Sequence, residues 1–280
     1  QKMRIATPVT TGHWFAMTGF LIQLCFLSFL FVGAAAAAPF FIGAMAQKEL
    51  TSPRKLFIMQ QDQSQNGCPV LNILGKEVVT MKSYTLKKIS GTPDWDAIAA
   101  LQIDVPYQEP ADIQAWAKLC WDETGIHVNL QTKEKNIRCQ ELQPLDPICE
   151  DSCLEFFIRP TEAMQYFNFE YNLACNIYLG FGSCIDDSIR LVPNDQKALF
   201  HPRSYRTEDG WGITYHIPFT FIQLFFPGFQ AQEGLQFYGN CYKCGDKTVQ
   251  PHYLSWNPIQ PGVLSFHCPA FFGRMILGGE

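Results

Sequence analysis

The chain has 280 residues, 47% of them hydrophobic and 14% aromatic, and a formal net charge of −5. This length allows one large or two small domains with a sizeable core. An acidic chain without a basic stripe argues against nucleic acid or an anionic membrane surface as its partner. The 23 Phe and 10 Tyr residues pack well on a pleated surface, so the composition favours an all-β domain.

Residues 1–46 predict an export segment. Lys2 and Arg4 precede a run without formal charge over residues 14–46, and Ala44-Met45-Ala46 fits a small-x-small cleavage site. This is the layout of a secretory signal peptide. The run exceeds the usual apolar core of such a peptide, so an uncleaved N-terminal membrane anchor is the alternative. Either way, we expect the folded part outside the cytoplasm, secreted or at the cell envelope.

Residues 47–77 are mixed and polar without apolar periodicity, which predicts a linker or loose arm. After it, short apolar or alternating runs separated by turn residues predict one domain over residues 78–280. We expect an antiparallel, jelly-roll-like β-sandwich with a few short helices. The predicted strands, in chain order, are 78–89, 115–121, 126–131, 153–159, 165–171, 178–181, 211–217, 235–243 and 274–277.

Turn and helix signals lie between these strands. Asp122-Glu123-Thr124-Gly125 separates two of them, and its Gly can take positive φ, so the pair is expected to form a hairpin. Thr92-Pro93-Asp94 begins a predicted helical turn that extends to residue 100, with Pro near its first position. Residues 219–225, after Pro218, predict a second short helix.

The chain has 11 cysteines, of which Cys25 lies in the export segment. An even number in an exported domain is typical of disulfides, and the alternative is small buried thiols. Cys120 and Cys153 lie in apolar predicted strands, where we expect buried thiols. The pairing of the others stays open.

Cys241-x-x-Cys244 would be half of a zinc site, and Cys149 with Cys153 could supply two more thiolates. All four fall in or beside predicted strands rather than in zinc knuckles. A redox pair of this spacing usually opens a helix, and none is predicted there. We therefore expect neither a metal nor a redox site at these cysteines.

Eight blocks of residues follow one another along the predicted domain. They are 87–91 with Trp95, 117–122 with 126–128, the strand Asp151-Ser152-Cys153-Leu154-Glu155-Phe156-Phe157, 166–172, 211–218, 240–246, 251–258 and 266–273. In this order they resemble the carbohydrate-binding modules of family 9, from about residue 78 to the end of the chain. The resemblance implies a β-sandwich that binds saccharides without catalysis, in better-studied members at the reducing end of a glycan between two aromatic rings. Such modules are often attached to glycan-degrading enzymes.

A sugar ring presents C–H groups on one face and hydroxyls around its rim, so its site needs an aromatic face and planar polar groups. Trp256 and Asn257, in a loop bounded by prolines, are the favoured pair, with a core Trp as the alternative. Trp121 would be the second ring, unless it covers the edge of the core at a strand end. Glu134 and Arg138 could gather hydroxyls, or form a solvated ion pair with each other.

Glu155 lies among apolar residues and is expected to be buried with a partner, Arg159 or Arg274. Glu155 and Glu170 could also be the two carboxylates of a glycosidase. Each lies in a strand block that the binding modules share, and the chain has no Gly-x-Ser-x-Gly, phosphate-loop or His-Glu-x-x-His motif. We therefore do not expect catalysis.

Two cofactors remain open. Calcium would suit the acidic pair Asp186-Asp187, since related sandwiches hold it by carboxylates and carbonyls, although a solvated acidic turn explains the pair better. Haem would take Met or His as axial ligands, and His267 and Met275 lie near the C-terminus. Neither cofactor has a defined pocket in the sequence.

These features predict an exported, non-catalytic carbohydrate-binding protein within glycan utilisation. Its partner would be a mono-, oligo- or polysaccharide, with aromatic stacking as the source of affinity and polar groups as the source of selectivity. The alternatives are a haem-binding sandwich of the electron-transfer type, an accessory module of a glycoside hydrolase system, and a surface protein that mediates adhesion without binding small sugars.

Overall fold

The structure is a computed structural model that describes residues 3–6, 80–107, 112–140, 142–143, 145–259 and 265–280. The chain divides into two units, and the described residues all belong to the larger one, made of Gln1–Pro8, Asp62–Val70 and Leu74–Glu280. Of the predicted export segment only β1 (Met3–Ala6) is described, antiparallel to β10 (Ile189–Pro193). The rest of that segment and the predicted linker at 47–77 lie outside the described residues.

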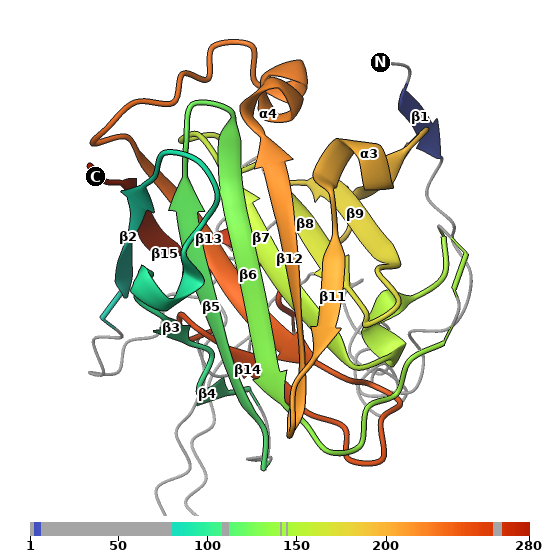
Figure 1. Cartoon of the computed structure of the whole chain (residues 1–280). Coiled ribbons are helices and arrows are strands. Elements are labelled where there is room, and N and C mark those ends of the chain that lie inside the picture. Colours follow the sequence, from blue (N-terminus) through green and yellow to red (C-terminus); the bar gives the residue numbers. More distant parts are fainter. Residues whose placement is uncertain (1–2, 7–79, 108–111, 141, 144, 260–264) are drawn as a thin grey trace, which may run out of the picture. The chain divides into compact units, whose positions relative to one another are not determined.

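Two layers of strands make up most of this unit (Figure 1). The first layer follows the order β1–β10–β9–β8–β7–β13–β15, with β14 beside β13 and β4 beside β14. Its remaining strands are β4 (Val105–Pro106), β7 (Cys153–Arg159), β8 (Tyr166–Tyr171), β9 (Ile177–Gly182), β13 (Gln236–Cys244), β14 (Tyr253–Ser255) and β15 (Gly273–Leu277).

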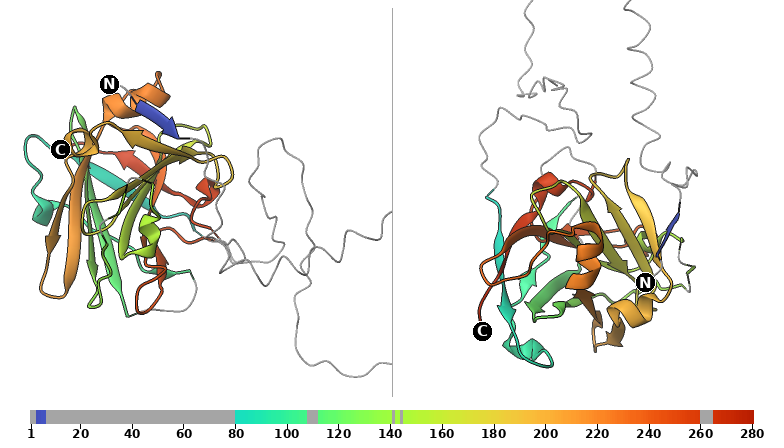
Figure 2. Two further views of the ribbon diagram at one scale, coloured as in Figure 1. Left: turned by 90° about the vertical axis from the view of Figure 1, so that its right-hand side faces the viewer. Right: turned by 90° about the horizontal axis from the view of Figure 1, so that it is seen from above.

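The second layer follows the order β2–β5–β6–β12–β11, with β3 beside β5. Its strands are β2 (Ser83–Lys88), β3 (Leu101–Gln102), β5 (Gln114–Trp121), β6 (Gly125–Lys133), β11 (Arg203–Arg206) and β12 (Gly210–Pro218). Strand β2 joins the layers at one edge, because its first part pairs with β15 and its last two residues pair with β5. Figure 2 shows the two layers from further sides, with the green and orange strands of the second next to the yellow and red strands of the first.

The predicted all-β sandwich is confirmed, and each of the nine predicted strands is present, β7 with the predicted bounds and the other eight with shifted ends. Two ladders differ from the prediction of a wholly antiparallel fold, since β2 runs parallel to both β15 and β5. The predicted helix at 219–225 is α4 (Phe219–Phe225). The predicted turn at 92–100 is shorter, a single 3-10 turn at η1 (Trp95–Ala97) with Asp94 as its cap.

The strands β1, β3, β4, β10, β11 and β14 and the helix α3 (Gln196–Phe200) were not predicted. All of them are two to five residues long, too short to show a clear periodic pattern. Among the described residues, no helix has the length and apolar character needed to cross a membrane.

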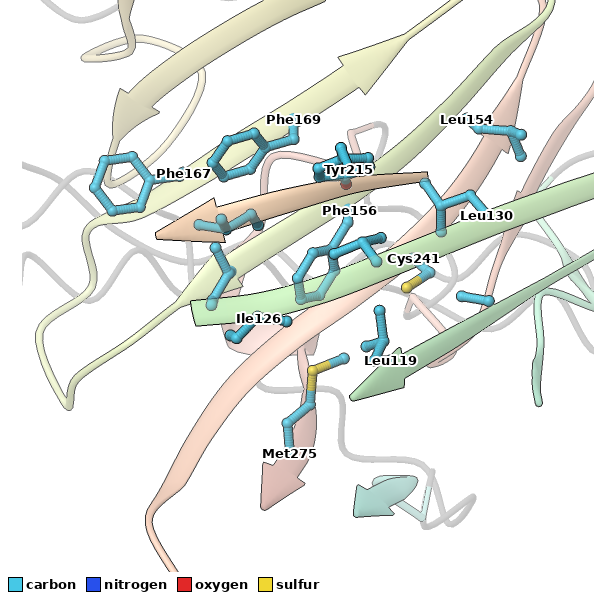
Figure 3. Close-up of a cluster of buried hydrophobic side chains, with 14 of the residues drawn as sticks. Leu119, Ile126, Leu130, Leu154, Phe156, Phe167, Phe169, Tyr215, Cys241 and Met275 are labelled. Carbon is cyan, nitrogen blue, oxygen red and sulfur yellow. The ribbon is translucent and has the colours of Figure 1, made fainter. Parts of the chain in front are cut away.

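Apolar side chains at alternate positions of the facing strands fill the core between the layers. Figure 3 shows part of this core, to which the first layer contributes Leu154, Phe156, Phe167, Phe169, Cys241 and Met275, and the second Leu119, Ile126, Leu130 and Tyr215. Because side chains alternate along a strand, the intervening residues of β7, β8 and β13 point to the opposite, outer face of the first layer. Polar and aromatic residues gather on that outer face.

Cys120 and Cys153 are free, buried thiols, as predicted. Cys241 belongs to the core between the layers, whereas Cys244, three residues on, packs with Cys153 on the outer face of the first layer. The two thiols of the Cys-x-x-Cys pair therefore lie on opposite faces of β13 and cannot share a metal or form a redox pair.

Candidate functional site

Trp256, the predicted sugar platform, is part of the core and is 4% exposed. Its ring packs on the backbone of β15, where a Cβ added to Gly273 would lie 2.4 Å from the Cζ3 atom. Asn257 is 3% exposed; its Oδ1 accepts from the Lys82 amide at 2.8 Å, and its Nδ2 donates to the Phe271 carbonyl at 2.9 Å. Neither residue has a free face or a free amide to offer a sugar.

Trp121, the second predicted ring, is 2% exposed at the end of β5. Its Nε1 donates to the Gly278 carbonyl at 2.9 Å, and its ring centroid lies 6.4 Å from that of Phe219. The structure thus places Trp121 as a strand-end ring that covers the edge of the core, which was the alternative interpretation.

Glu134 and Arg138 are not paired with each other. Glu134 is 3% exposed; its carboxylate accepts from the Ser152 hydroxyl at 2.7 Å and lies 3.2 Å from Lys243 Nζ. Arg138 pairs instead with buried Asp151, at 3.1 Å. Each side chain is held by a partner from a distant part of the sequence, so the predicted solvated pair is wrong and the structure does not gather the five predicted residues into one open surface.

The positions of the candidate ligands argue against the haem and calcium alternatives. His267 forms a hydrogen bond with Tyr166 on the outer face of the first layer, whereas Met275 is fully buried in the core on the other face. These two side chains cannot ligate one haem. Asp187 Oδ1 accepts from two backbone amides of its own turn, at 2.7 and 2.9 Å, as expected of an acidic turn that needs no ion.

The outer face of the first layer contains the candidate site, because strand register arranges its side chains in rows. The row that crosses β9, β8, β7 and β13 contains Tyr178, Glu170, Glu155 and Tyr242. The row beside it contains Arg190, Gly180, Asn168, Phe157 and Asn240. A third row contains Cys153, Cys244 and Tyr253. Adjacent residues in a row are direct cross-strand neighbours, so their side chains lie close enough to contact one ligand.

Three half-buried rings, Tyr107, Tyr253 and Phe266, form what we call the aromatic group. Tyr107 lies edge-on to the other two, at centroid distances of 6.4 Å from Tyr253 and 5.7 Å from Phe266. Phe266 also stacks on buried Tyr242 at 4.2 Å. The three rings come from the end of β4, from β14 and from the segment before η3 (Pro269–Phe271), so the fold assembles an aromatic surface that no single segment contains.

Three carboxyl groups, Glu155, Glu170 and Asp246, form the acidic group beside these rings. Burial raises the pKa of all three. The pKa of Glu170 rises to about 7, although a hydrogen bond from Asn168 at 2.7 Å opposes the shift. The pKa of Glu155 is held well above its usual range by burial and by Glu170 directly opposite. Its partner is the Cys244 thiol, which donates at 2.8 Å, and not Arg159 or Arg274 as predicted.

Arg190 and Asn168 complete the polar part of the site. The Arg190 guanidinium lies over the Tyr178 ring, 3.3 Å from its centroid, and its charge stabilises ionised Glu170. Asn168 Oδ1 is buried without a hydrogen-bond partner among the described residues. Buried polar atoms are usually satisfied, and because Asn168 is fully buried this acceptor suits an enclosed water molecule.

A metal-like group also lies on this face. The sulfur atoms of Cys153 and Cys244 and a carboxylate oxygen of Glu155 are all within 4.8 Å of one another. Burial raises the pKa of both thiols, so the groups are protonated and hydrogen-bonded to each other. Hydrogen bonding accounts for this trio.

A hollow of about 200 Å³ between β3, β4, β5 and β14 is less suited to a sugar. Its lining has polar groups but no aromatic side chain; it consists of Gln102, Asp104, Pro106, Ile113, Gln114, Ala115 and Leu254. It therefore lacks the stacking surface that the aromatic group provides.

The raised pKa of Glu170 predicts a pH-dependent stability. A carboxyl whose folded pKa is about 7 and whose unfolded pKa is 4.5 contributes stability that is fully present below pH 4.5 and lost as pH rises through 7. We expect Glu170→Gln, which cannot ionise, to reduce the loss of unfolding free energy between pH 5 and 8 by roughly 2 kcal/mol. Urea unfolding of wild type and variant at each pH measures this, with exposed Glu162→Gln as the control. Parallel pH profiles for Glu170→Gln and wild type would contradict it.

Sequence reasoning missed the aromatic group and the role of the acids. Tyr253 and Phe266 belong to blocks of the resemblance, but nothing local shows that they meet Tyr107. A usable signal was present in β7 and β8, where Glu155, Asn168 and Glu170 interrupt mostly apolar strands at positions that point away from the core. A polar residue at such positions indicates an outer face with a function.

Comparisons with known proteins agree with this fold. The sequence profile of carbohydrate-binding family 9 matches residues 113–277. A candidate carbohydrate-binding protein of known structure from Bacteroides uniformis is 26% identical; the match covers 72% of this chain and 100% of that one, with a TM-score of 0.62. No curated protein matches the chain.

Two structures of a family 9 module from Caldicellulosiruptor kristjanssonii share the fold at 12% identity, one in complex with glucose and one with cellotriose. Both matches cover 71% of this chain, and they cover 97% and 95% of the modules, with TM-scores of 0.52 and 0.51. Because the family profile spans more than half of the chain and the two-layered sandwich agrees with it, the chain belongs to carbohydrate-binding family 9.

Proposed function

We propose that this protein is an exported, non-catalytic carbohydrate-binding protein that holds a saccharide on the outer face of its first layer. Membership of carbohydrate-binding family 9 carries the proposal. The structures of the Caldicellulosiruptor module with glucose and with cellotriose support it. The partner is a mono-, oligo- or polysaccharide, and the setting is glycan utilisation outside the cytoplasm, which the uncharged run at residues 14–46 favours.

The outer face offers the two kinds of contact that a sugar ring needs. The aromatic group presents partly exposed rings to the C–H face of the sugar. Half-buried Arg190 presents donors to the hydroxyl rim, and Glu170 and Asn168, buried beside it, hold this polar row in place. Affinity then comes from stacking and selectivity from the polar row.

The two facing glutamates suit binding better than hydrolysis. A glycosidase needs one ionised carboxylate as nucleophile or base. Burial holds the pKa of Glu155 well above its usual range and that of Glu170 at about 7, so both groups favour the protonated form in weakly acidic solution. Both carboxyls are also buried and hydrogen-bonded within the protein, Glu155 to the Cys244 thiol and Glu170 to Asn168.

Isothermal titration with glucose, cellotriose and a panel of glycans tests the proposal. We expect Tyr253→Ala to weaken the binding of the recognised sugar about tenfold, because it removes a stacking ring worth about 1.4 kcal/mol. Tyr253→Phe keeps the ring and should retain most of the affinity.

Tyr205→Ala is the matched control. Tyr205 is a half-buried ring on β11, on the outer face of the second layer, and donates to Asn129 at 2.7 Å. Its removal should leave sugar affinity unchanged. A folded wild-type protein that binds no glycan would refute the function, and equal effects of Tyr253→Ala and Tyr205→Ala would refute the location.

A further inference from the structure

The outer face of the second layer brings two histidines and an aspartate together. His127 on β6 and His216 on β12 are direct cross-strand partners. Their neighbours Ile126, Val128 and Ile217 point into the core, so both imidazoles point outward, where they are half-buried with ring centroids 4.6 Å apart. Two imidazoles held side by side on adjacent strands form one half of a metal site before any loop residue is added.

Asp122 adds a carboxylate from the β5–β6 turn. Its Oδ1 accepts from the Thr124 amide at 2.7 Å and from the Gly125 amide at 3.1 Å, which fixes the orientation of the carboxylate. Its other oxygen, Oδ2, lies 2.8 Å from His127 Nε2. The turn thus presents one oxygen to the histidines while the other closes the turn.

Gly125 makes this arrangement possible. A Cβ at this position would lie 2.4 Å from His216 Nε2 and 2.3 Å from the Ile217 carbonyl oxygen. Only a residue without a side chain lets the His216 imidazole approach the turn. Thr124 Oγ1, 3.2 Å from His216 Nε2, is the hydroxyl next to that nitrogen.

We propose that Asp122, His127 and His216 bind a zinc ion, with water completing the coordination. One ligand atom from each of the three residues lies within 4.8 Å of the other two. Tetrahedral zinc with bonds of about 2.0–2.2 Å needs ligand atoms about 3.4 Å apart, which small side-chain rotations reach from this geometry. The side chains of Asp122 and His127 are 20% and 19% exposed, so solvent can supply the remaining ligand.

The ligand chemistry selects the metal class. Two imidazole nitrogens and one carboxylate oxygen suit zinc and its neighbours among the transition metals, whereas calcium and magnesium prefer oxygen ligands throughout. The site lies on the second layer, away from the aromatic and acidic groups of the first, so this proposal does not depend on the proposed sugar site. A bound ion would link the β5–β6 turn, β6 and β12.

Zinc titration of the full chain, freed of metal with a chelator, tests the site. We expect one zinc ion per chain, a rise in Tm of about 5 °C or more at saturating zinc, and X-ray absorption that shows nitrogen and oxygen ligands including imidazole. His216→Ala should weaken zinc binding at least about 100-fold, since loss of a direct ligand exceeds the 10–100-fold effect of an outer-shell partner. Asp122→Asn should weaken it too while its remaining oxygen still caps the turn.

His201→Asn is the matched control, because His201 is exposed and lies outside the trio; its backbone is left-handed at φ 49°, which Asn tolerates. It should bind zinc like wild type. If His216→Ala does not fold in chelator, zinc binding is measured on His127→Gln instead. This variant leaves the contact between Gly125 and His216 in place and should also bind zinc more weakly than wild type. Absence of saturable zinc binding by wild type, undiminished binding by folded variants of the trio, or sulfur ligands in the absorption spectrum would overturn the proposal.

Discussion

Trp256→Ala is expected to destabilise the fold by about 3–5 kcal/mol, the range for loss of a large aromatic ring from a packed core. The ring is 4% exposed and packs directly on the backbone at Gly273, so neighbouring groups cannot close the cavity without moving β15. Urea unfolding of wild type and variant measures the loss. Trp116→Ala, which removes a half-buried ring from the outer face of β5, is the control and should cost much less.

The same variant separates a core ring from a sugar platform. If Trp256 were a sugar platform, its truncation would abolish sugar binding with little loss of protein stability. Truncation of a core ring lowers the stability of the protein, while the folded fraction retains its affinity for the recognised glycan. Trp256→Ala that is as stable as wild type but no longer binds glycan would therefore contradict the placement of Trp256 in the core.

The main strands could be predicted from sequence because their patterns are local. In β7 and β12, residues that alternate between core and outer face, or long apolar runs, mark the strand without knowledge of its partners. The β5–β6 hairpin was predictable from its Asp122–Gly125 turn, although Gly125 does not take the positive φ expected of it; a side chain there would instead meet the Ile217 carbonyl and His216.

The remaining parts of the fold depend on distant partners. Strands β3 and β4 have two residues each and exist through pairing with β5 and β14. Strand β2 could be located, but its parallel pairing with β15 joins residues 191 positions apart, such as Ser83 and Arg274. No local pattern encodes such a pairing.

The site was predicted less well than the fold for the same reason. Trp256 in a loop bounded by prolines suggested exposure, and only the approach of Gly273 on β15 shows that the ring is enclosed. Tyr107, Tyr253 and Phe266 are unremarkable in sequence and become a group only through the pairing of β4 with β14 and the return of the C-terminal segment.

Lys243→Met is expected to destabilise the protein by about 3–5 kcal/mol, because it leaves the buried Glu134 carboxylate without its cation. Lys243 is fully buried; its ammonium lies 3.2 Å from Glu134 Oε2 and donates to His252 Nε2 at 2.7 Å. Chemical unfolding at pH 7 measures the loss. Lys133→Met breaks the exposed pair of Lys133 with Asp209, at 2.9 Å, and should have a far smaller effect.

The double variant Lys243→Met/Glu134→Gln removes both charges and should recover much of the lost stability, since a neutral pair leaves no uncompensated buried charge. No recovery would show that the Lys243 side chain acts through packing or through its other hydrogen bonds.

His252 makes this effect depend on pH. Burial and the Lys243 charge lower its pKa to about 4 in the folded protein, below the ordinary 6.5. In wild type, stability from this group is therefore present above pH 6.5 and lost as pH falls toward 4. In Lys243→Met, a proton on His252 instead replaces the missing cation 3.8 Å from Glu134. The stability difference between wild type and Lys243→Met should shrink as pH falls from 7 to 5, and a difference that stays constant or grows would show that His252 does not share the Glu134 charge.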